Sequence, residues 1–166
     1  MADRVLPYGR QYIEDDDVAA VAAALRSDYL TTGPAVSSFE AAFARAVGAS
    51  HAVACMNGTA ALHLAALALD LKPGDCAIVP AVTFLATANA VRYMGAEPVF
   101  ADVDASTALM SPAHLEAAIA RAPIPPKAVF PVHMGGPCCD MAGIAAVAAR
   151  HSFAVVEDAC HALGTR

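Results

Sequence analysis

Residues 76–103 read CAIVPAVTFLATANAVRYMGAEPVFADV and contain two short apolar runs on either side of a helical pattern. The runs are Cys76–Pro80 and Pro98–Val103, and the helix expected between them is Leu85–Met94. Both runs are continuously apolar, which is typical of strands that are covered on both faces of a parallel sheet. The stretch therefore predicts a strand–helix–strand unit.

The same alternation continues on both sides of this unit. Ser111-Pro112 and Asp140 are favourable helix starts, because a capping side chain precedes the first turn. The further strands are expected at His51–Met56, Lys127–Val132 and Phe153–Glu157, and the further helices at Thr59–Leu71, Pro112–Arg121 and Met141–Arg150. This order predicts the α/β class, with a doubly wound, mostly parallel sheet flanked by helices.

Residues 1–50 have a different pattern, typical of two amphipathic helices. Glu14, Asp15 and Asp16 favour the start of the first helix through the helix dipole. The apolar stripes expected to face a core are Val18, Val21 and Leu25 in the first helix and Val36, Phe39, Phe43 and Val47 in the second, which Gly48 ends. We expect residues 1–50 to form an N-terminal helical segment and residues 51–166 to form part of an α/β domain.

Composition excludes several classes of protein. Hydrophobic residues make up 58% and charged residues 16% of the 166, which excludes an intrinsically disordered chain. The net charge of −6, without a basic face, argues against nucleic-acid binding. The longest stretch without Asp, Glu, Lys or Arg, residues 46–69, is broken by turn residues, so no membrane span is expected. Five cysteines without a C-x-x-C motif, and an N-terminus without an apolar signal region, predict a reduced cytoplasmic protein.

Three candidate ligand contacts follow predicted strands, at the edge of the sheet where open α/β proteins bind ligands. Asn57-Gly58-Thr59 precedes a helix and could bind a phosphate through free backbone N–H groups, or be an ordinary turn with Thr59 as the cap. Phe84 could stack on a flat cofactor or be a core side chain. Asp158 ends a buried strand, where an acid is costly unless it is paired, so it is a candidate functional group or a helix cap.

Two weaker features lie at the same edge. His133 with Gly135-Gly136 could allow a close approach of backbone to ligand, or form a flexible turn. Cys138-Cys139-Asp140, with His133 and His161, has soft ligand atoms, but its spacing matches no zinc pattern, so no metal site is predicted. The fingerprints G-x-G-x-x-G and Walker A are also absent, which disfavours a Rossmann-type oxidoreductase.

Seven blocks in register resemble the DegT/DnrJ/EryC1/StrS family of sugar aminotransferases, which use pyridoxal phosphate (PLP) on the type I fold. Each block is weak by itself, and the shared order makes the resemblance specific. The blocks are Tyr8–Gln11, Leu30–Pro34 with Phe39-Glu40, Asn57–Leu64, Thr83–Ala90, Gly95–Phe100 with Asp102–Asp104, Pro131–His133 and Glu157–Gly164. Tyr8–Gln11, Gly136–Met141 and His161 further resemble the pseudaminic-acid pathway transaminase, which aminates C4 of a UDP-linked 4-keto-6-deoxy-N-acetyl sugar.

The resemblance implies a role for each candidate residue. Gly58 and Thr59 would bind the cofactor phosphate, and Phe84 would stack on the pyridine ring. Asp158 would pair with the ring nitrogen, and His161 would hydrogen-bond the phenolic oxygen. Tyr8 and Thr31 would lie near the sugar or the partner subunit. The resemblance implies a nucleotide-sugar substrate, an amino-acid donor such as glutamate, and a homodimer.

One departure from the family is large. The family's Schiff-base lysine lies downstream of the Asp158 block, whereas the two lysines here, Lys72 and Lys127, match no such motif. We therefore expect the chain to be the front part of a longer protein and to be inactive alone. The alternative is a non-catalytic remnant that binds a partner chain or a sugar nucleotide.

Overall fold

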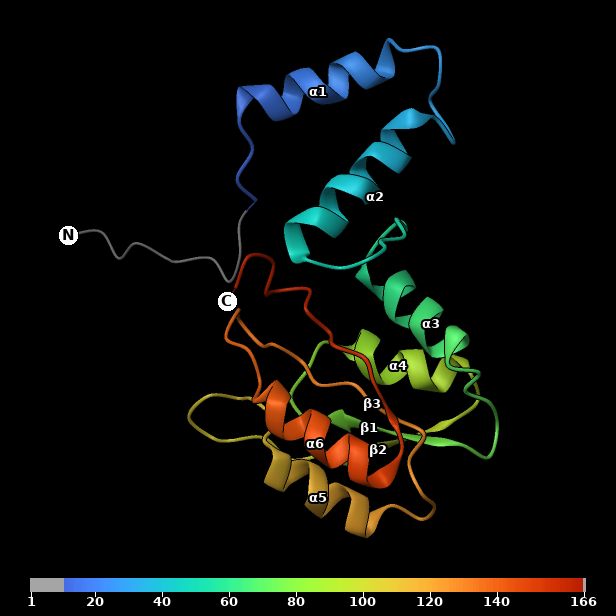
Figure 1. Cartoon of the computed structure of the whole chain (residues 1–166), viewed down its shortest axis with the longest axis vertical. Coiled ribbons are helices and arrows are strands. Elements are labelled where there is room, and N and C mark those ends of the chain that lie inside the picture. The colour runs from blue at the N-terminus through green and yellow to red at the C-terminus, as the bar shows by residue number, and fades with distance from the viewer. Residues whose placement is uncertain (1–10, 166) are drawn as a thin grey trace, which may run out of the picture. The chain divides into compact units, whose positions relative to one another are not determined.

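A computed structural model describes residues 11–165, and the chain divides into two units between Ala54 and Cys55 (Figure 1). Residues 11–54 contain two helices, α1 (Asp15–Leu25) and α2 (Pro34–Val47). Glu14 begins α1 in a reciprocal capping arrangement with Asp17. Pro34 occupies the first turn of α2, and Gly48 ends that helix with φ at 71°, a conformation that favours glycine.

The apolar stripes of these two helices are exposed except at the half-buried Phe43, so the prediction that they face a core is wrong for the other stripe residues of the described unit. Val18, Val21 and Leu25 are 59%, 61% and 67% exposed. Within residues 11–54 only Ala44 is buried.

Residues 55–165 form the predicted parallel sheet with helices on both faces. The strand order is β2-β1-β3-β4, and every pairing is parallel. The strands are β1 (Cys76–Pro80), β2 (Glu97–Ala101), β3 (Ala128–Val129) and β4 (Ala154–Val155). The helices are α3 (Gly58–Ala68), α4 (Leu85–Tyr93), α5 (Pro112–Arg121) and α6 (Met141–His151). The α/β class is therefore as predicted, and so is the order of the elements from α3 onward.

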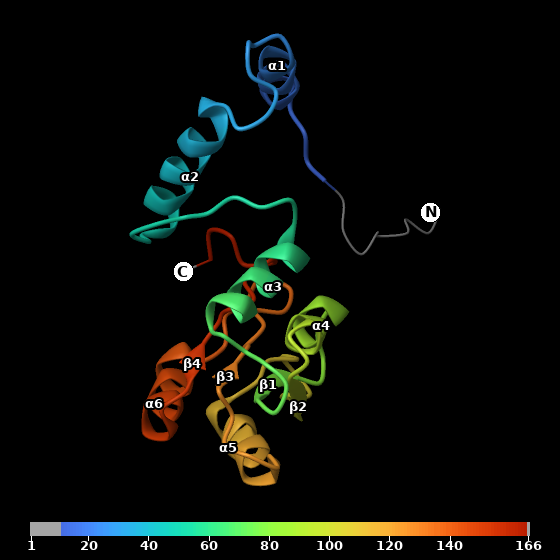
Figure 2. The same cartoon turned by 90° about the vertical axis from the view of Figure 1, so that its right-hand side faces the viewer.

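Two apolar layers hold this unit together, one on each face of the sheet. Figure 2 shows α3 and α4 on one side of the strands and α5 and α6 on the other. Leu62, Val91 and Phe130 belong to the layer under α3 and α4. Ile78 and Leu115 belong to the layer under α5 and α6. Because both faces are covered at the centre of the sheet, β1 is apolar and buried at all five positions, whereas the edge strand β2 begins with the exposed Glu97.

The strand expected at His51–Met56 does not form, and this is a correction to the sequence prediction. The segment has no strand assignment, and Val53 and Met56 are 82% and 89% exposed. A strand requires a hydrogen-bonded neighbour, and no described residue pairs with this one.

The strands after Lys127 and Phe153 are shorter than predicted because a proline interrupts their pairing. Pro131 has no N–H to donate, so regular pairing ends at Val129. Pairing resumes in a bridge between Val132 and Asp158, where the N–H of His133 donates to the carbonyl of Asp158 at 3.1 Å. This bridge fixes the backbone of Asp158 at the carboxyl edge of the sheet.

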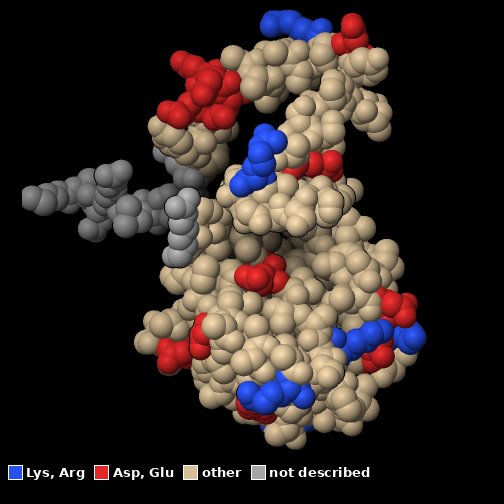
Figure 3. Space-filling view, in the orientation of Figure 1, with Lys and Arg blue, Asp and Glu red and all other residues tan. Residues whose placement is uncertain are grey.

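Charged groups on the visible face of this unit are sparse and of both signs (Figure 3). No helix among residues 11–165 has the length and apolar character needed to cross a membrane.

Candidate functional site

A cavity of about 210 Å³ lies at the carboxyl ends of the strands, within residues 55–165. It brings together five predicted site residues that are far apart in the sequence: Gly58, Thr59, Phe84, Asp158 and His161. The other lining residues are Leu62, Ala86, Val132, His133, Met134 and Cys160. Thr31, also predicted as a site residue, is exposed in the loop between α1 and α2, and Tyr8 lies outside the described residues.

The first turn of α3 lines this cavity with free backbone N–H groups. Asn57, and not Thr59, caps the helix, because its Oδ1 accepts from the N–H of Ala60 at 2.9 Å. The N–H of Ala61 donates to the carbonyl of Asn57 at 3.1 Å. A helix start leaves four N–H groups without helical partners, so those of Gly58 and Thr59 remain for a ligand. Together with the positive end of the helix dipole, they suit a phosphate.

A close contact disfavours a side chain at Gly58. A Cβ at this position would lie 2.7 Å from Sγ of Cys160. The chain after Asp158 therefore packs directly against the first turn of α3. Burial, followed by the hydrogen bond and charge of Asp158, raises the pKa of Cys160 to about 11. This thiol is consequently neutral at physiological pH.

Asp158 is a buried acid, 6% exposed, in the wall of the cavity. Its Oδ2 accepts from Oγ1 of Thr87 at 2.7 Å, and its Oδ1 accepts from the N–H of Cys160 at 3.4 Å. Among residues 11–165, no Lys, Arg or His side chain forms an ion pair with it. A buried carboxylate held only by neutral donors is suited to a cationic ligand group.

Phe84 and His161 complete the polar and aromatic lining. Phe84 precedes α4 and is 71% exposed, so the interpretation of this residue as a core side chain is wrong. The N–H of Gly135 donates to Nδ1 of His161 at 3.3 Å. A neutral imidazole that accepts at Nδ1 carries its proton at Nε2, so His161 can donate a hydrogen bond to a ligand oxygen.

His133 is also fixed by two hydrogen bonds. Its Nδ1 accepts from the N–H of Cys139 at 3.3 Å, and its Nε2 lies 2.9 Å from Oε2 of Glu157. Because both ring nitrogens are engaged, His133 orders the loop around Gly135 and is not free to act as a base. No group of three or more possible metal ligands occurs in the described part of the chain.

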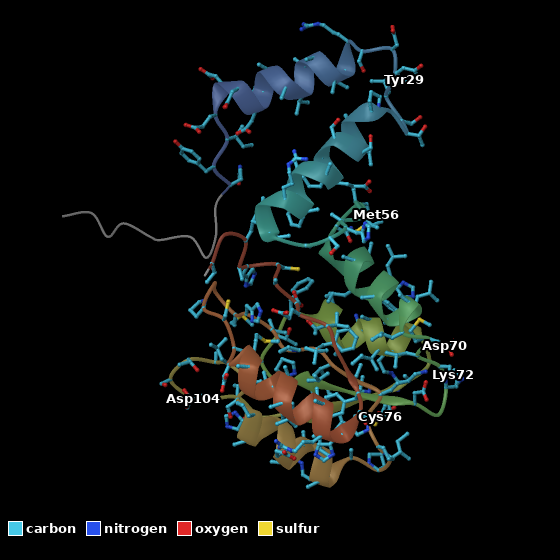
Figure 4. The ribbon with its side chains drawn as sticks, viewed as in Figure 1. Tyr29, Met56, Asp70, Lys72, Cys76 and Asp104 are labelled. Atoms are coloured by element: carbon cyan, nitrogen blue, oxygen red, sulfur yellow. The ribbon has the colours of Figure 1, made fainter. Side chains whose placement is uncertain are left out.

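Both lysines lie at the opposite, amino edge of the sheet. Nζ of Lys127, just before β3, lies 3.2 Å from Oδ2 of Asp75. Lys72 pairs with Asp70 in the turn between α3 and β1, where Figure 4 shows the two side chains together. Neither lysine lines the cavity.

Sequence reasoning missed one group in this site, Thr87. It is fully buried in the first turn of α4 and donates to Asp158 across 71 residues of sequence. The available signal was its spacing of four residues from Thr83, which places both hydroxyls on one side of the helix start.

Comparisons with known proteins agree with this geometry. The model of the DegT/DnrJ/EryC1/StrS aminotransferase family matches residues 11–166. The chain is 47% identical over 160 residues to the spore coat polysaccharide biosynthesis protein SpsC of Bacillus subtilis (strain 168), covering 96% of this chain and 40% of that protein. The chain thus spans about 40% of the length of this curated relative.

Two solved structures are similar over most of the chain. The aminotransferase from Psychrobacter cryohalolentis has a TM-score of 0.85 at 36% identity, covering 95% of this chain and 40% of that one. NtdA from Bacillus subtilis, with bound cofactor PMP, has a TM-score of 0.83 at 35% identity, covering 92% of this chain and 35% of that one.

Proposed function

The chain belongs to the DegT/DnrJ/EryC1/StrS aminotransferase family, and we propose that its cavity binds PLP for the transamination of a nucleotide-linked keto sugar. The observation that carries this proposal is Asp158, a buried carboxylate without a cationic partner among residues 11–165. A protonated pyridine nitrogen is the cation that would complete this pair. SpsC, named for polysaccharide biosynthesis, supports a sugar substrate.

The residues of the cavity fit the different parts of this cofactor. The free N–H groups of Gly58 and Thr59 would bind its phosphate at the start of α3. Phe84 would cover one face of its ring, and Nε2–H of His161 would donate to its phenolic oxygen. Asp158 would hold the proton on the ring nitrogen. When bound, the protonated ring supplies the electron sink that amino transfer requires.

The second part of the proposal is the identity of the sugar substrate and the amino donor. The resemblance of Gly136–Met141 and His161 to the pseudaminic-acid pathway enzyme supports a UDP-linked 4-keto-6-deoxy-N-acetyl sugar with glutamate as the donor. Thr31 and Tyr8 remain proposed contacts to the sugar or to a second subunit of a homodimer. All five cysteines are free thiols, which supports a reducing compartment such as the cytoplasm.

The 166-residue chain is proposed to be inactive by itself, because Lys72 and Lys127 both lie outside the cavity. The alternative is that the chain binds a partner or a sugar nucleotide without catalysis, which the exposed stripe of α1 favours.

The experiment begins with the intact mass of the protein in its native source. A species well above 16.9 kDa would be purified and assayed with glutamate and the UDP-keto sugar, with 2-oxoglutarate as the readout. The proposal predicts 2-oxoglutarate formation by the longer species and none by the 166-residue chain. Robust turnover by the 166-residue chain, or none by a longer PLP-loaded species, would contradict it. Saturable sugar-nucleotide binding by a native 16.9 kDa species without turnover would support the alternative.

A further inference from the structure

Two threonine hydroxyls form a hydrogen-bonded chain that ends on Asp158. Oγ1 of Thr83 lies 2.7 Å from Oγ1 of Thr87, and Oγ1 of Thr87 lies 2.7 Å from Oδ2 of Asp158. Thr83 directly precedes the N-cap Phe84, and Thr87 is in the first turn of α4. The chain of hydroxyls therefore connects the start of α4 to the acid after β4.

The number of available protons determines which hydroxyl donates in each of these two hydrogen bonds. A hydroxyl has one proton, and an ionised carboxylate can only accept, so Thr87 must donate to Asp158. Thr87 then has only lone pairs for Thr83, which must donate to it. The other acceptor near Thr83, the carbonyl of Phe84, is farther away at 3.2 Å.

The two oxygens of Asp158 consequently differ. Oδ2 is held by a short bond to a fully buried hydroxyl, whereas the N–H of Cys160 approaches Oδ1 at the longer distance of 3.4 Å. Both donors are neutral, so the carboxylate keeps its full negative charge for a ligand. The positive end of the α4 dipole lies on the side of Thr87 and favours that charge.

We propose that Thr87 is a positioning residue that holds Oδ2 of Asp158, so that Oδ1 is directed at the pyridine nitrogen of the cofactor. This inference rests on the proposed binding of PLP. Without the hydroxyl of Thr87, the carboxylate can rotate, and Oδ2 becomes a buried acceptor without a partner. Thr83 contributes by orienting the Thr87 proton, so its removal has a smaller effect.

The test compares PLP with 1-deazapyridoxal phosphate, which has a C–H group in place of the ring nitrogen. The ratio of the two dissociation constants measures the interaction with the nitrogen alone, because every other contact is shared. It is measured by fluorescence titration of the 166-residue chain as wild type, Thr87→Val, Thr87→Ser, Asp158→Asn and the double variant Thr87→Val with Asp158→Asn. A charge-assisted hydrogen bond predicts that wild type prefers PLP about tenfold or more.

Thr87→Val is expected to lose most of this preference, and Thr87→Ser, which restores the hydroxyl, to keep it within about threefold. In the Asp158→Asn background, Thr87→Val is expected to leave the ratio unchanged, since no carboxylate remains to be directed. Thermal unfolding of each variant separates loss of fold from loss of preference.

Three other outcomes of the titration would each contradict a specific part of the proposal. If Thr87→Val weakens both ligands equally, Thr87 only supports the fold, and the inference fails while PLP binding stands. If wild type binds both ligands equally, the pairing of Asp158 with the nitrogen fails as well. If wild type binds neither ligand, both the inference and the binding of PLP by this cavity are wrong.

Discussion

Replacement of Gly58 by alanine tests the contact between α3 and the chain after Asp158, because two effects on stability have opposite signs. Gly58 does not have a positive φ, so alanine fits the backbone. Helix propensity alone favours alanine over glycine by up to about 1 kcal/mol. However, the new Cβ would lie 2.7 Å from Sγ of Cys160, well inside the normal contact distance.

The steric effect is expected to exceed the propensity effect. Forcing an extra carbon into a packed contact costs about 1–3 kcal/mol, because neighbouring groups must move. Gly58→Ala should therefore lower the free energy of unfolding by about 1 kcal/mol. In the Cys160→Ala background the Sγ atom is gone, so the same change should be neutral or stabilising.

The assay is urea unfolding of the wild type, both single variants and the double variant. The four free energies form a cycle whose coupling term is expected to reach about 1 kcal/mol or more, since the residues are in direct contact. A phosphate analogue titrated into each variant shows whether the strain also disturbs the first turn of α3. A coupling near zero, with Gly58→Ala equally stabilising in both backgrounds, would refute the contact.

Two further predictions concern charged groups in the same unit. Burial and the charge of Asp158 raise the pKa of Cys160 to about 11, so its alkylation should be slow at pH 8 and accelerate as the pH approaches 11. Asp158→Asn removes the negative charge that contributes to that rise, so peptide mass spectrometry should find Cys160 alkylated faster at pH 8. Cys138 serves as the internal control, and an unchanged rate would contradict this. Lys127→Met breaks a partly buried ion pair before β3 and should lower the unfolding free energy by about 1 kcal/mol. Lys72→Met breaks an exposed ion pair and should change the unfolding free energy by less than about 0.5 kcal/mol. Equal decreases in the two variants would contradict the prediction that the more buried ion pair stabilises the fold more.

The local sequence was sufficient to predict those helices and strands whose burial pattern or capping residues lie within the element or directly beside it. The bounds of β1 at Cys76–Pro80 and α5 at Pro112–Arg121 agree with the prediction residue for residue. The first is a buried apolar run, and the second starts at a serine cap followed by proline. The segment at His51–Met56 has the same apolar signal but no strand, because pairing depends on a neighbour that local sequence does not contain.

Part of the site was predictable because some of its residues lie next to strands and helices that the sequence predicts. Gly58, Phe84 and Asp158 each follow a strand or precede a helix, so topology alone places them at one edge of the sheet. The spacing of Thr87 from Thr83 was the one local signal, and the partner of Thr87 becomes apparent only when the fold brings Asp158 against it. The contact of Cys160 with Gly58 likewise depends on packing between distant segments.

The central claim is that Asp158 holds a protonated pyridine nitrogen in this cavity. The most direct measurement is the ¹⁵N NMR chemical shift of PLP labelled at its ring nitrogen, bound to the wild-type chain and to Asp158→Asn at pH 8. Asp102→Asn, at an exposed acid after β2, serves as the matched control. The account predicts a protonated nitrogen in the wild type and in the control, and an unprotonated one in Asp158→Asn. An unprotonated nitrogen in the wild type, or the same protonated shift in all three proteins, would contradict it.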